Sequence, residues 1–267
     1  MISSIRAAVW EQHPLIHCIT NPISINQCAN AILAVGARPI MAEHPQEAAE
    51  ITATAGALLL NLGNITDVRM ESMRISADTA QKQKIPFVLD LVGIACSKLR
   101  HTFAGELLKQ SAPAVIKGNY SEIQALYQCG YHSSGVDADA SLTQSAVRTA
   151  AAALACRYHT VVLASGPTDL VTDGTRMLLI QNGTPQLASV TGTGCMLGAL
   201  CASYLAVGTA LSAAAAACAV LGISGERAAT ACGSGSFGIR LMDQLSTLTD
   251  PDLKKYLKLE ETDIEKL

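Results

Sequence analysis

The tetrapeptide Phe87-Val88-Leu89-Asp90 sets the expected fold of this chain. It is a short apolar run that ends on a carboxylate, a pattern typical of a strand buried on both faces of a parallel sheet. Comparable runs predict further strands at Leu15–Thr20, Pro39–Ala42, Leu58–Leu62, Ala114–Lys117 and Thr160–Ala164.

The segments between these runs carry apolar residues at helical spacing. They predict helices at Ile25–Val35, Gln46–Ala55, Thr66–Gln83, Leu99–Gln110, Ser121–Tyr127 and Ser141–Tyr158. Strands that alternate with helices build βαβ units, because parallel neighbours need a crossover connection. We therefore expect an α/β fold with a mostly parallel central sheet and helices on both of its faces.

The sequence after the sixth predicted strand changes in character. Asp173-Gly174 separates the runs Leu170–Thr172 and Arg176–Ile180, which predicts a hairpin at an antiparallel edge of the sheet. Glycine-rich turns and alanine-rich segments then predict helices at Cys195–Val207 and Ala210–Thr230.

The tail from residue 249 to residue 267 is charged and begins with an Asp-Pro helix start, so it is predicted to be a surface helix. No Pro/Ser-rich linker divides the chain, and residues 1–267 are expected to form one domain.

The composition excludes several classes of protein. With 49% hydrophobic and 15% charged residues, the chain has too much apolar sequence to be disordered. Its net charge of -3 argues against a general nucleic-acid binder, which needs a basic face. No run of about 18 apolar residues predicts a membrane span. The nine cysteines include no C-x-x-C pair, and nothing at the N-terminus resembles a signal peptide, so a cytoplasmic location is expected.

The strongest local motif is Val190-Thr191-Gly192-Thr193-Gly194-Cys195, which stands directly before a predicted helix. Glycines and a helix start together expose backbone N–H groups, which suit a phosphate or a developing oxyanion. The alternative is an ordinary glycine turn that opens a helix. The motif is not a Walker A loop, because no Gly-Lys-Ser/Thr follows. A second glycine-rich turn, Gly233-Ser234-Gly235-Ser236-Phe237, precedes another helix in the same half of the chain.

Polar residues follow three predicted strands at the point where each strand ends. They are Asp90, Lys117-Gly118-Asn119 and Ser165-Gly166. Ligands of open α/β sheets bind outside the carboxyl ends of the strands, so these residues predict a site. Glu122, in the first turn of the next helix, either caps that helix or helps to hold a hydrated magnesium ion.

Several of these motifs also occur, in the same order, in one known family. They are His17-Cys18-Ile19-Thr20-Asn21, Cys28-Ala29-Asn30-Ala31 with Gly36-Ala37, Pro39-Ile40-Met41-Ala42-Glu43, Lys117-Gly118-Asn119 with Ser121-Glu122-Ile123, and Val190-Thr191-Gly192-Thr193-Gly194-Cys195-Met196-Leu197, continuing to Gly235-Ser236-Phe237. Through these motifs, which extend over nearly its whole length, the chain resembles hydroxyethylthiazole kinase.

The resemblance implies a ribokinase-like, three-layer α/β/α fold and a homotrimer with active sites between subunits. It implies magnesium-dependent transfer of the ATP γ-phosphate to the hydroxyl of 4-methyl-5-(2-hydroxyethyl)thiazole, a step of thiamine biosynthesis and salvage. The expected partners are therefore small molecules, with neither nucleic acid nor membrane among them.

The resemblance also implies a role for individual residues. Cys195 stands where related sugar kinases carry an aspartate base, and it is expected to act with Gly194 and Thr193 in catalysis. The other expected roles are substrate binding by Met41, Gly192 and Asn21, ATP binding by Lys117, Ser165 and Asn119, and magnesium binding by Asp90 and Glu122. The chain departs from the family pattern at three places, where Lys117 replaces a frequent arginine, Leu91 a proline and Ser165 a threonine.

Three other functions are compatible with parts of the sequence. The first is a kinase for another small alcohol, such as hydroxymethylpyrimidine. The second is an acyltransferase or hydrolase with Cys195 as nucleophile, which needs a base within hydrogen-bond reach. The third is a binder of thiazole or nucleotide that catalyses nothing.

Overall fold

The computed structural model describes residues 2–128, 130–131 and 142–264, and within them nine strands form one sheet. The spatial order is β2-β1-β3-β4-β5-β6-β7-β8-β9. The pairs from β2 to β6 are parallel, and those from β6 to β9 are antiparallel. The strands are β1 (Leu15–Ile19), β2 (Arg38–Ile40), β3 (Ala57–Asn61), β4 (Phe87–Asp90), β5 (Val115–Asn119), β6 (Val161–Ser165), β7 (Asp169–Thr172), β8 (Arg176–Ile180) and β9 (Leu259–Asp263).

Helices connect the strands and continue after β8. They are α1 (Ile2–Gln12), α2 (Ile25–Ala34), α3 (Pro45–Thr54), α4 (Asp67–Gln83), α5 (Lys98–Gln110), α6 (Tyr120–Tyr127), α7 (Gln144–Tyr158), the 3-10 helix η1 (Pro185–Ser189), α8 (Thr193–Leu205), α9 (Ala210–Ala228), α10 (Ser234–Thr247) and α11 (Asp250–Tyr256). Among the residues described, no helix is both long and apolar enough to cross a membrane.

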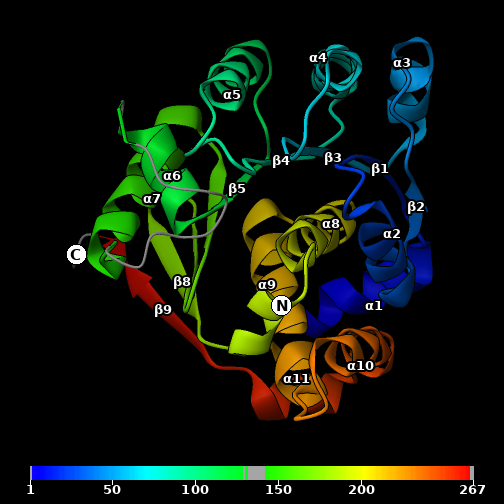
Figure 1. Cartoon of the computed structure of the whole chain (residues 1–267), viewed down its shortest axis with the longest axis vertical. Coiled ribbons are helices and arrows are strands. Elements are labelled where there is room, and N and C mark those ends of the chain that lie inside the picture. Colours follow the sequence, from blue (N-terminus) through cyan, green and yellow to red (C-terminus); the bar gives the residue numbers. More distant parts are fainter. Residues whose placement is uncertain (1, 129, 132–141, 265–267) are drawn as a thin grey trace.

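The sheet separates two apolar cores and so makes three layers. One core joins one face of the strands to α1, α2, α8, α9 and α10, and the other joins the opposite face to α4, α5, α6 and α7. Figure 1 shows α3, α4 and α5 on one side of the sheet and α2, α8 and α9 on the other. Because β3 and β4 are buried on both faces, their sequences are continuous apolar runs up to the polar residue that ends each strand. The predicted α/β/α architecture is confirmed.

The tail is where the prediction is wrong in part. Residues 250–256 form the expected helix α11, but residues 259–263 form strand β9, which pairs antiparallel with β8. The hairpin of β7 and β8 is antiparallel as predicted, yet β9 rather than the hairpin makes the edge. Ser141, the predicted start of α7, lies outside the described residues, and α7 begins at Gln144.

The strand order reverses between β1 and β3, because β2 lies on one side of β1 and β3 on the other. Connections that leave neighbouring strands in opposite directions open a crevice at the carboxyl ends of those strands. Asn21 follows β1 and Gly63 follows β3, so both residues stand at this crevice. Helix α8 crosses the same end of the sheet, and Gly198 lets it approach closely, since a Cβ there would lie 3.1 Å from Asp90 Oδ2.

Candidate active site

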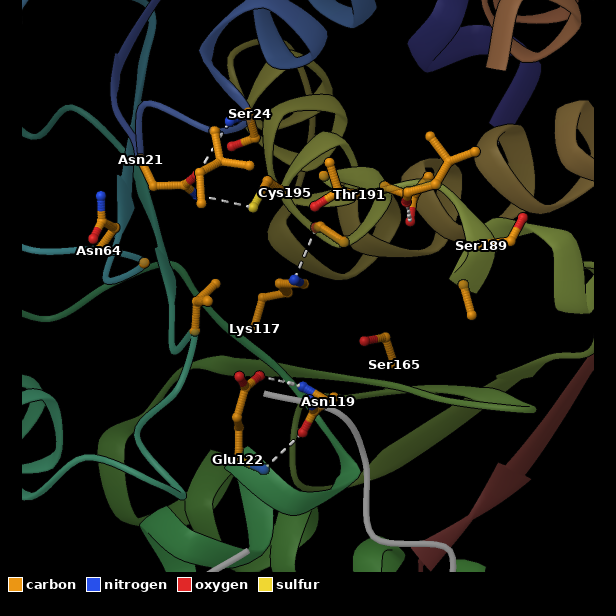
Figure 2. A pocket seen from close by; sticks show the side chains of 18 of the residues that line it. Asn21, Ser24, Asn64, Lys117, Asn119, Glu122, Ser165, Ser189, Thr191 and Cys195 are labelled. Atoms are coloured by element: carbon orange, nitrogen blue, oxygen red, sulfur yellow. Dashed lines mark hydrogen bonds between the residues drawn. The ribbon is translucent and has the colours of Figure 1, made fainter. Parts of the chain in front are cut away.

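A pocket of about 640 Å³ opens at the carboxyl ends of the parallel strands. Its walls come from the residues that follow β1, β3, β4, β5 and β6 and from the segment that leads into α8. Figure 2 shows Asn21, Ser24 and Cys195 on one side of this pocket, Asn119 and Glu122 on the other, and Lys117 between them. The pocket therefore gathers side chains that are up to 174 residues apart in sequence.

The start of α8 presents free backbone donors to this pocket. Gly192 is the N-cap residue, with φ of +88°, a conformation that other residues rarely adopt. A Cβ at Gly192 would also press on Ser24, at 3.2 Å. No acceptor among the described residues takes a hydrogen bond from the N–H groups of Thr193, Gly194 or Cys195. These donors lie at the positive end of the helix dipole, an arrangement suited to an anion.

A chain of hydrogen bonds runs from Cys195 into the sheet. Asn21 Nδ2 lies 3.2 Å from Cys195 Sγ and also donates to Asn61 Oδ1 at 3.2 Å. Asn61 Nδ2 in turn donates to Asp90 Oδ2 at 2.9 Å. Cys195 is 8% exposed, so its thiol reaches the pocket while its position is fixed from below.

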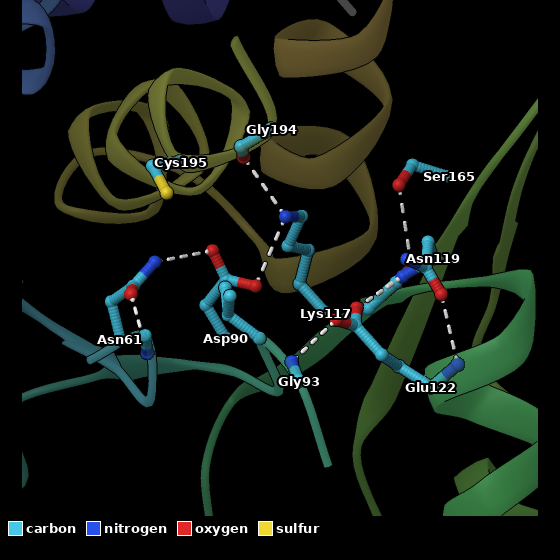
Figure 3. Close-up of polar contacts among 12 residues, drawn as sticks. Asn61, Asp90, Gly93, Lys117, Asn119, Glu122, Ser165, Gly194 and Cys195 are labelled. Carbon is cyan, nitrogen blue, oxygen red and sulfur yellow. Dashed lines mark hydrogen bonds and ion pairs between the residues drawn. The ribbon is translucent and has the colours of Figure 1, made fainter. Parts of the chain in front are cut away.

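Lys117 forms a buried ion pair with Asp90 beneath the pocket. Lys117 Nζ lies 3.0 Å from Asp90 Oδ1 and donates to the Gly194 carbonyl at 2.8 Å (Figure 3). Burial alone would lower the pKa of Lys117, but the carboxylates of Asp90 and Glu122 outweigh burial and hold that pKa above its ordinary value. The pair ties the start of α8 to strands β4 and β5.

Glu122 serves as a helix cap and also faces the pocket. Glu122 Oε2 accepts from the Asn119 N–H, and the Asn119 side chain accepts from the Glu122 N–H at 2.9 Å, which completes a capping box. Its other oxygen accepts from the Gly93 N–H at 2.7 Å. Burial raises the pKa of Glu122 to about 7, although Lys117 and these backbone donors oppose the shift.

A second pocket, of about 630 Å³, lies on the other side of the α8 start. It shares Asn119, Ser165, Thr193 and Gly194 with the first pocket but has a more apolar wall, formed by residues that include Pro167, Leu187, Leu197 and Leu221. It also contains the carboxylate of Asp169, whose Oδ1 accepts from the Gly166 N–H at 3.1 Å. Burial raises the pKa of Asp169 to about 6, against the opposing effect of this hydrogen bond.

Most of the residues singled out from the sequence meet in the first pocket. Nine of them line it, namely Asn21, Lys117, Asn119, Glu122, Ser165, Gly192, Thr193, Gly194 and Cys195. Asp90 is fully buried below it, behind Lys117. Met41 follows β2, packs partly buried against the core and lines neither pocket of its own chain.

Three further residues of the site were not predicted from the sequence. Asn61 ends β3 as Asp90 ends β4, and the two pair in the sheet register, so the strand-end rule could have found it. Ser24 lines the pocket beside Gly192, and Arg100 lines it from the first turn of α5. No local motif marks Ser24 or Arg100, because the fold alone brings them to the pocket.

The acyltransferase alternative lacks a base hydrogen-bonded to its nucleophile in the part of the chain that the structure describes. No histidine lines either pocket within the described residues. The hydrogen-bond partner of Cys195 is the Asn21 amide, which cannot accept a proton as a general base does. The geometry therefore gives no support to a covalent mechanism at Cys195.

The fold is that of the ribokinase-like class. A solved ribokinase-like superfamily protein from Enterococcus faecalis V583 superimposes with a TM-score of 0.65 at 13% identity, covering 91% of this chain and 87% of that one. At that identity the likeness concerns the fold alone.

The chain belongs to the hydroxyethylthiazole kinase family, whose model matches residues 7–251. Hydroxyethylthiazole kinase 2 of Clostridium botulinum (strain 657 / Type Ba4) is 45% identical over 260 residues, which cover 96% of this chain and 98% of that protein. The solved hydroxyethylthiazole kinase of Pyrococcus horikoshii OT3 superimposes with a TM-score of 0.90 at 33% identity and covers 98% of both chains.

Proposed function

We propose that this chain transfers the γ-phosphate of ATP to the hydroxyl of 4-methyl-5-(2-hydroxyethyl)thiazole, a step of thiamine biosynthesis. The proposal rests on the position of the α8 start between the two pockets, where Thr193 and Gly194 line both of them. The more apolar pocket would hold the nucleoside of ATP, and the first pocket, the acceptor pocket, would hold the alcohol. The phosphates of ATP and the hydroxyl of the acceptor would then both lie at the same backbone donors. Membership of the hydroxyethylthiazole kinase family supports the choice of acceptor.

Phosphoryl transfer depends mainly on alignment and on neutralising charge, rather than on covalent chemistry by the protein. The N–H groups of Thr193, Gly194 and Cys195 would surround the phosphoryl group as it moves. Lys117 fixes this segment through the Gly194 carbonyl, so the donors are in place before substrate binds. Ser165 and Asn119 lie at the boundary of the two pockets, where the phosphates would pass.

Cys195 and Asn21 would act on the acceptor. The thiol lines the acceptor pocket and is oriented by the Asn21 amide, so it would orient the hydroxyl or accept its proton. Gly192 would contact the thiazole, because it lines this pocket and leaves room beside Ser24. A loose transition state needs little help from a base until late in the transfer.

The residues present fit a hydrated magnesium ion. No group of three or more His, Cys, Asp or Glu side chains among the described residues could form a cage for a metal. Magnesium in kinases instead keeps several waters and is held by one or two carboxylates and the substrate phosphates. Glu122 lines the pocket and would hold the ion, whereas Asp90 is paired with Lys117 below the pocket and would not contact it. When bound, the ion neutralises charge on the phosphates.

The active protein is proposed to be a cytoplasmic homotrimer with sites between subunits. Two features support the interfacial site. Ile23 is 61% exposed although it borders the first pocket, and Met41 lines neither of the two pockets described above. A neighbouring subunit would cover Ile23 and bring its Met41 to the thiazole. All eight cysteines among the described residues are free, as expected in a reducing compartment.

A competition assay tests the choice of acceptor. ADP release would be measured with hydroxyethylthiazole, hydroxymethylpyrimidine and pyridoxal, each alone and in pairs. The proposal expects the thiazole to give the highest kcat/KM and to suppress turnover of the other two alcohols. A higher kcat/KM with hydroxymethylpyrimidine would contradict it and would favour the kinase for another small alcohol.

A further inference from the structure

The proposed phosphate site needs a cation that Lys117 does not supply. Two of the three donors of the Lys117 ammonium are engaged, one by Asp90 Oδ1 and one by the Gly194 carbonyl. Asp90 also balances the charge of Lys117 inside the protein. A triphosphate carries several negative charges, so a second, unpaired cation would stabilise it in the pocket.

Arg100 is the unpaired cation of the pocket among the residues described. It lines the same pocket as Glu122 and Lys117, and no carboxylate of the described residues forms an ion pair with it. Its guanidinium has five N–H donors, and with the described residues it makes one hydrogen bond, from Nη1 to the Val92 carbonyl at 3.2 Å. Most of its donors are therefore available to a ligand.

The position of Arg100 on its helix is unfavourable without a ligand. Ser97 is the N-cap of α5, so Arg100 lies in the first turn, near the positive end of the helix dipole. A cation is disfavoured there, and an anion is favoured. The first turn of α5 carries no acidic residue to compensate. A bound phosphate would satisfy both the arginine and the helix terminus.

The loop between β4 and α5 is shaped around this side chain. Gly93 has φ of +77°, and a Cβ atom there would overlap the Arg100 guanidinium. The Gly93 N–H meanwhile donates to Glu122 Oε1 at 2.7 Å. The same glycine thus lets the guanidinium lie across the loop and orients the carboxylate expected to hold magnesium.

We propose that Arg100 binds the phosphate that is transferred, first as the γ-phosphate of ATP and afterwards as the phosphate of the product. Arg100 lines the first pocket and not the second, more apolar pocket, which would hold the nucleoside. It therefore lies beyond the α8 start, on the acceptor side, and contacts the terminal phosphate rather than the α-phosphate. This assignment rests on the proposed function, because it takes its phosphate from that reaction.

Equilibrium binding of a nucleotide series to the assembled protein tests the proposal. Adenosine, ADP and a non-hydrolysable ATP analogue would be titrated, with magnesium, into wild type, Arg100→Gln and Arg100→Lys. In Arg100→Gln the ATP analogue should bind roughly 10- to 100-fold more weakly, since a charged hydrogen bond is lost. Adenosine and ADP should bind as in wild type. Arg100→Lys keeps the charge but not the fork, so it should lose less affinity.

A matched variant controls for the loss of charge itself. Arg240 on α10 is exposed, lines neither pocket and has no ion pair among the described residues, so Arg240→Gln should leave all three affinities unchanged. Thiazole phosphate, titrated without nucleotide, should also bind more weakly to Arg100→Gln. This titration tests the contact with the product phosphate independently of the contact with ATP.

Two outcomes would overturn the role of Arg100. Wild-type affinity of Arg100→Gln for the ATP analogue would mean that Arg100 touches no phosphate. An equal loss for adenosine, ADP and the analogue would mean that it only holds the loop through Val92. Thermal unfolding of each variant would show that the protein is folded, and Arg100→Lys replaces Arg100→Gln if the latter is not. Because the nucleotide series contains no acceptor, a wrong acceptor would leave the nucleotide affinities intact and would appear in the competition assay and in the titration with thiazole phosphate.

Discussion

At the scale of single residues, the Lys117–Asp90 pair determines how the site is held together. Both side chains are almost completely buried, and within the described residues the partners of Asp90 are Lys117 and Asn61. A buried pair is weak evidence for stability as a whole, but removal of one partner leaves an uncompensated charge. The start of α8 therefore depends on an ion pair in the interior of the sheet. Three strands, β2, β1 and β3, lie on one side of β4, which carries Asp90.

Lys117→Met should lower the free energy of unfolding by about 3–5 kcal/mol, because Asp90 loses its counter-ion in the interior. Urea unfolding at one protein concentration would measure the change. Lys82→Met is the control, since Lys82 pairs with Asp78 on the surface and should cost at most about 1 kcal/mol. Equal effects of the two substitutions would show that the buried pair does not hold the site.

Glu122 makes the stability of the folded protein depend on pH. Its pKa of about 7 in the folded state lies above the ordinary value of 4.5, so the folded protein binds the proton more tightly than the unfolded chain does. The stabilisation from this proton is complete below about pH 4.5 and is lost as the pH rises through about 7.

The free energy of unfolding of the wild type should decrease as the pH rises from 4.5 to 7, and Glu122→Gln should lack this decrease. The difference in unfolding free energy, wild type minus Glu122→Gln, should fall as the pH rises through this range. Urea unfolding at intervals across it, without ATP or metal, would measure the difference. A difference that rises with pH would contradict the expected sign and would mean that the carboxylate is stabilised by its partners.

At the scale of elements, the strands were predictable because their burial dictates their sequence. Strands such as β3 and β4 have both faces in the core, so their apolar runs are readable without the fold. Strand β9 contains Glu260 and Glu261 and has the composition of a solvated tail, and its pairing with β8 decides its structure. Local sequence carries little information about such tertiary pairing.

The same distinction applies to the site. Asp90, Lys117 and Ser165 were predictable because parallel strands end at one edge of the sheet, and that rule needs only the strand positions. The ion pair between Asp90 and Lys117 follows from the register of β4 and β5, where the two residues are paired, and the sequence does not reveal which strands are neighbours. Arg100 needed the path of the loop before α5, which depends on Gly93 and on Glu122 from another element.

Removal of strand β9 should weaken the antiparallel edge but leave the chemistry intact. A chain that ends at Lys258 would expose the edge of β8, so we expect a lower melting temperature and faster aggregation on heating. The activity of the folded protein at 25 °C should be unchanged, because β9 is separated from the pocket by other strands. A chain shortened by residues 265–267 alone serves as the control. A loss of activity without loss of stability would contradict this account.

At the scale of the whole molecule, the proposed interfacial site predicts complementation between two inactive variants. Met41→Asp would damage the thiazole contact that one subunit supplies, and Gly192→Val would block the α8 start of the other. Each variant alone should be inactive. Random mixing by co-expression should restore about a quarter of wild-type activity, because one in four interfaces combines both intact parts. Mixed assemblies without activity would mean that each site lies within one chain.

The two pockets on either side of the α8 start are proposed to bring ATP and hydroxyethylthiazole together for phosphoryl transfer. Phosphorus NMR of the purified protein with ATP, magnesium and hydroxyethylthiazole tests this proposal most directly. We expect a new phosphomonoester signal that grows in step with ADP and is abolished by EDTA. ATP that stays intact, with folded protein that binds both ligands, would contradict the claim and would leave a protein that binds these molecules without catalysis.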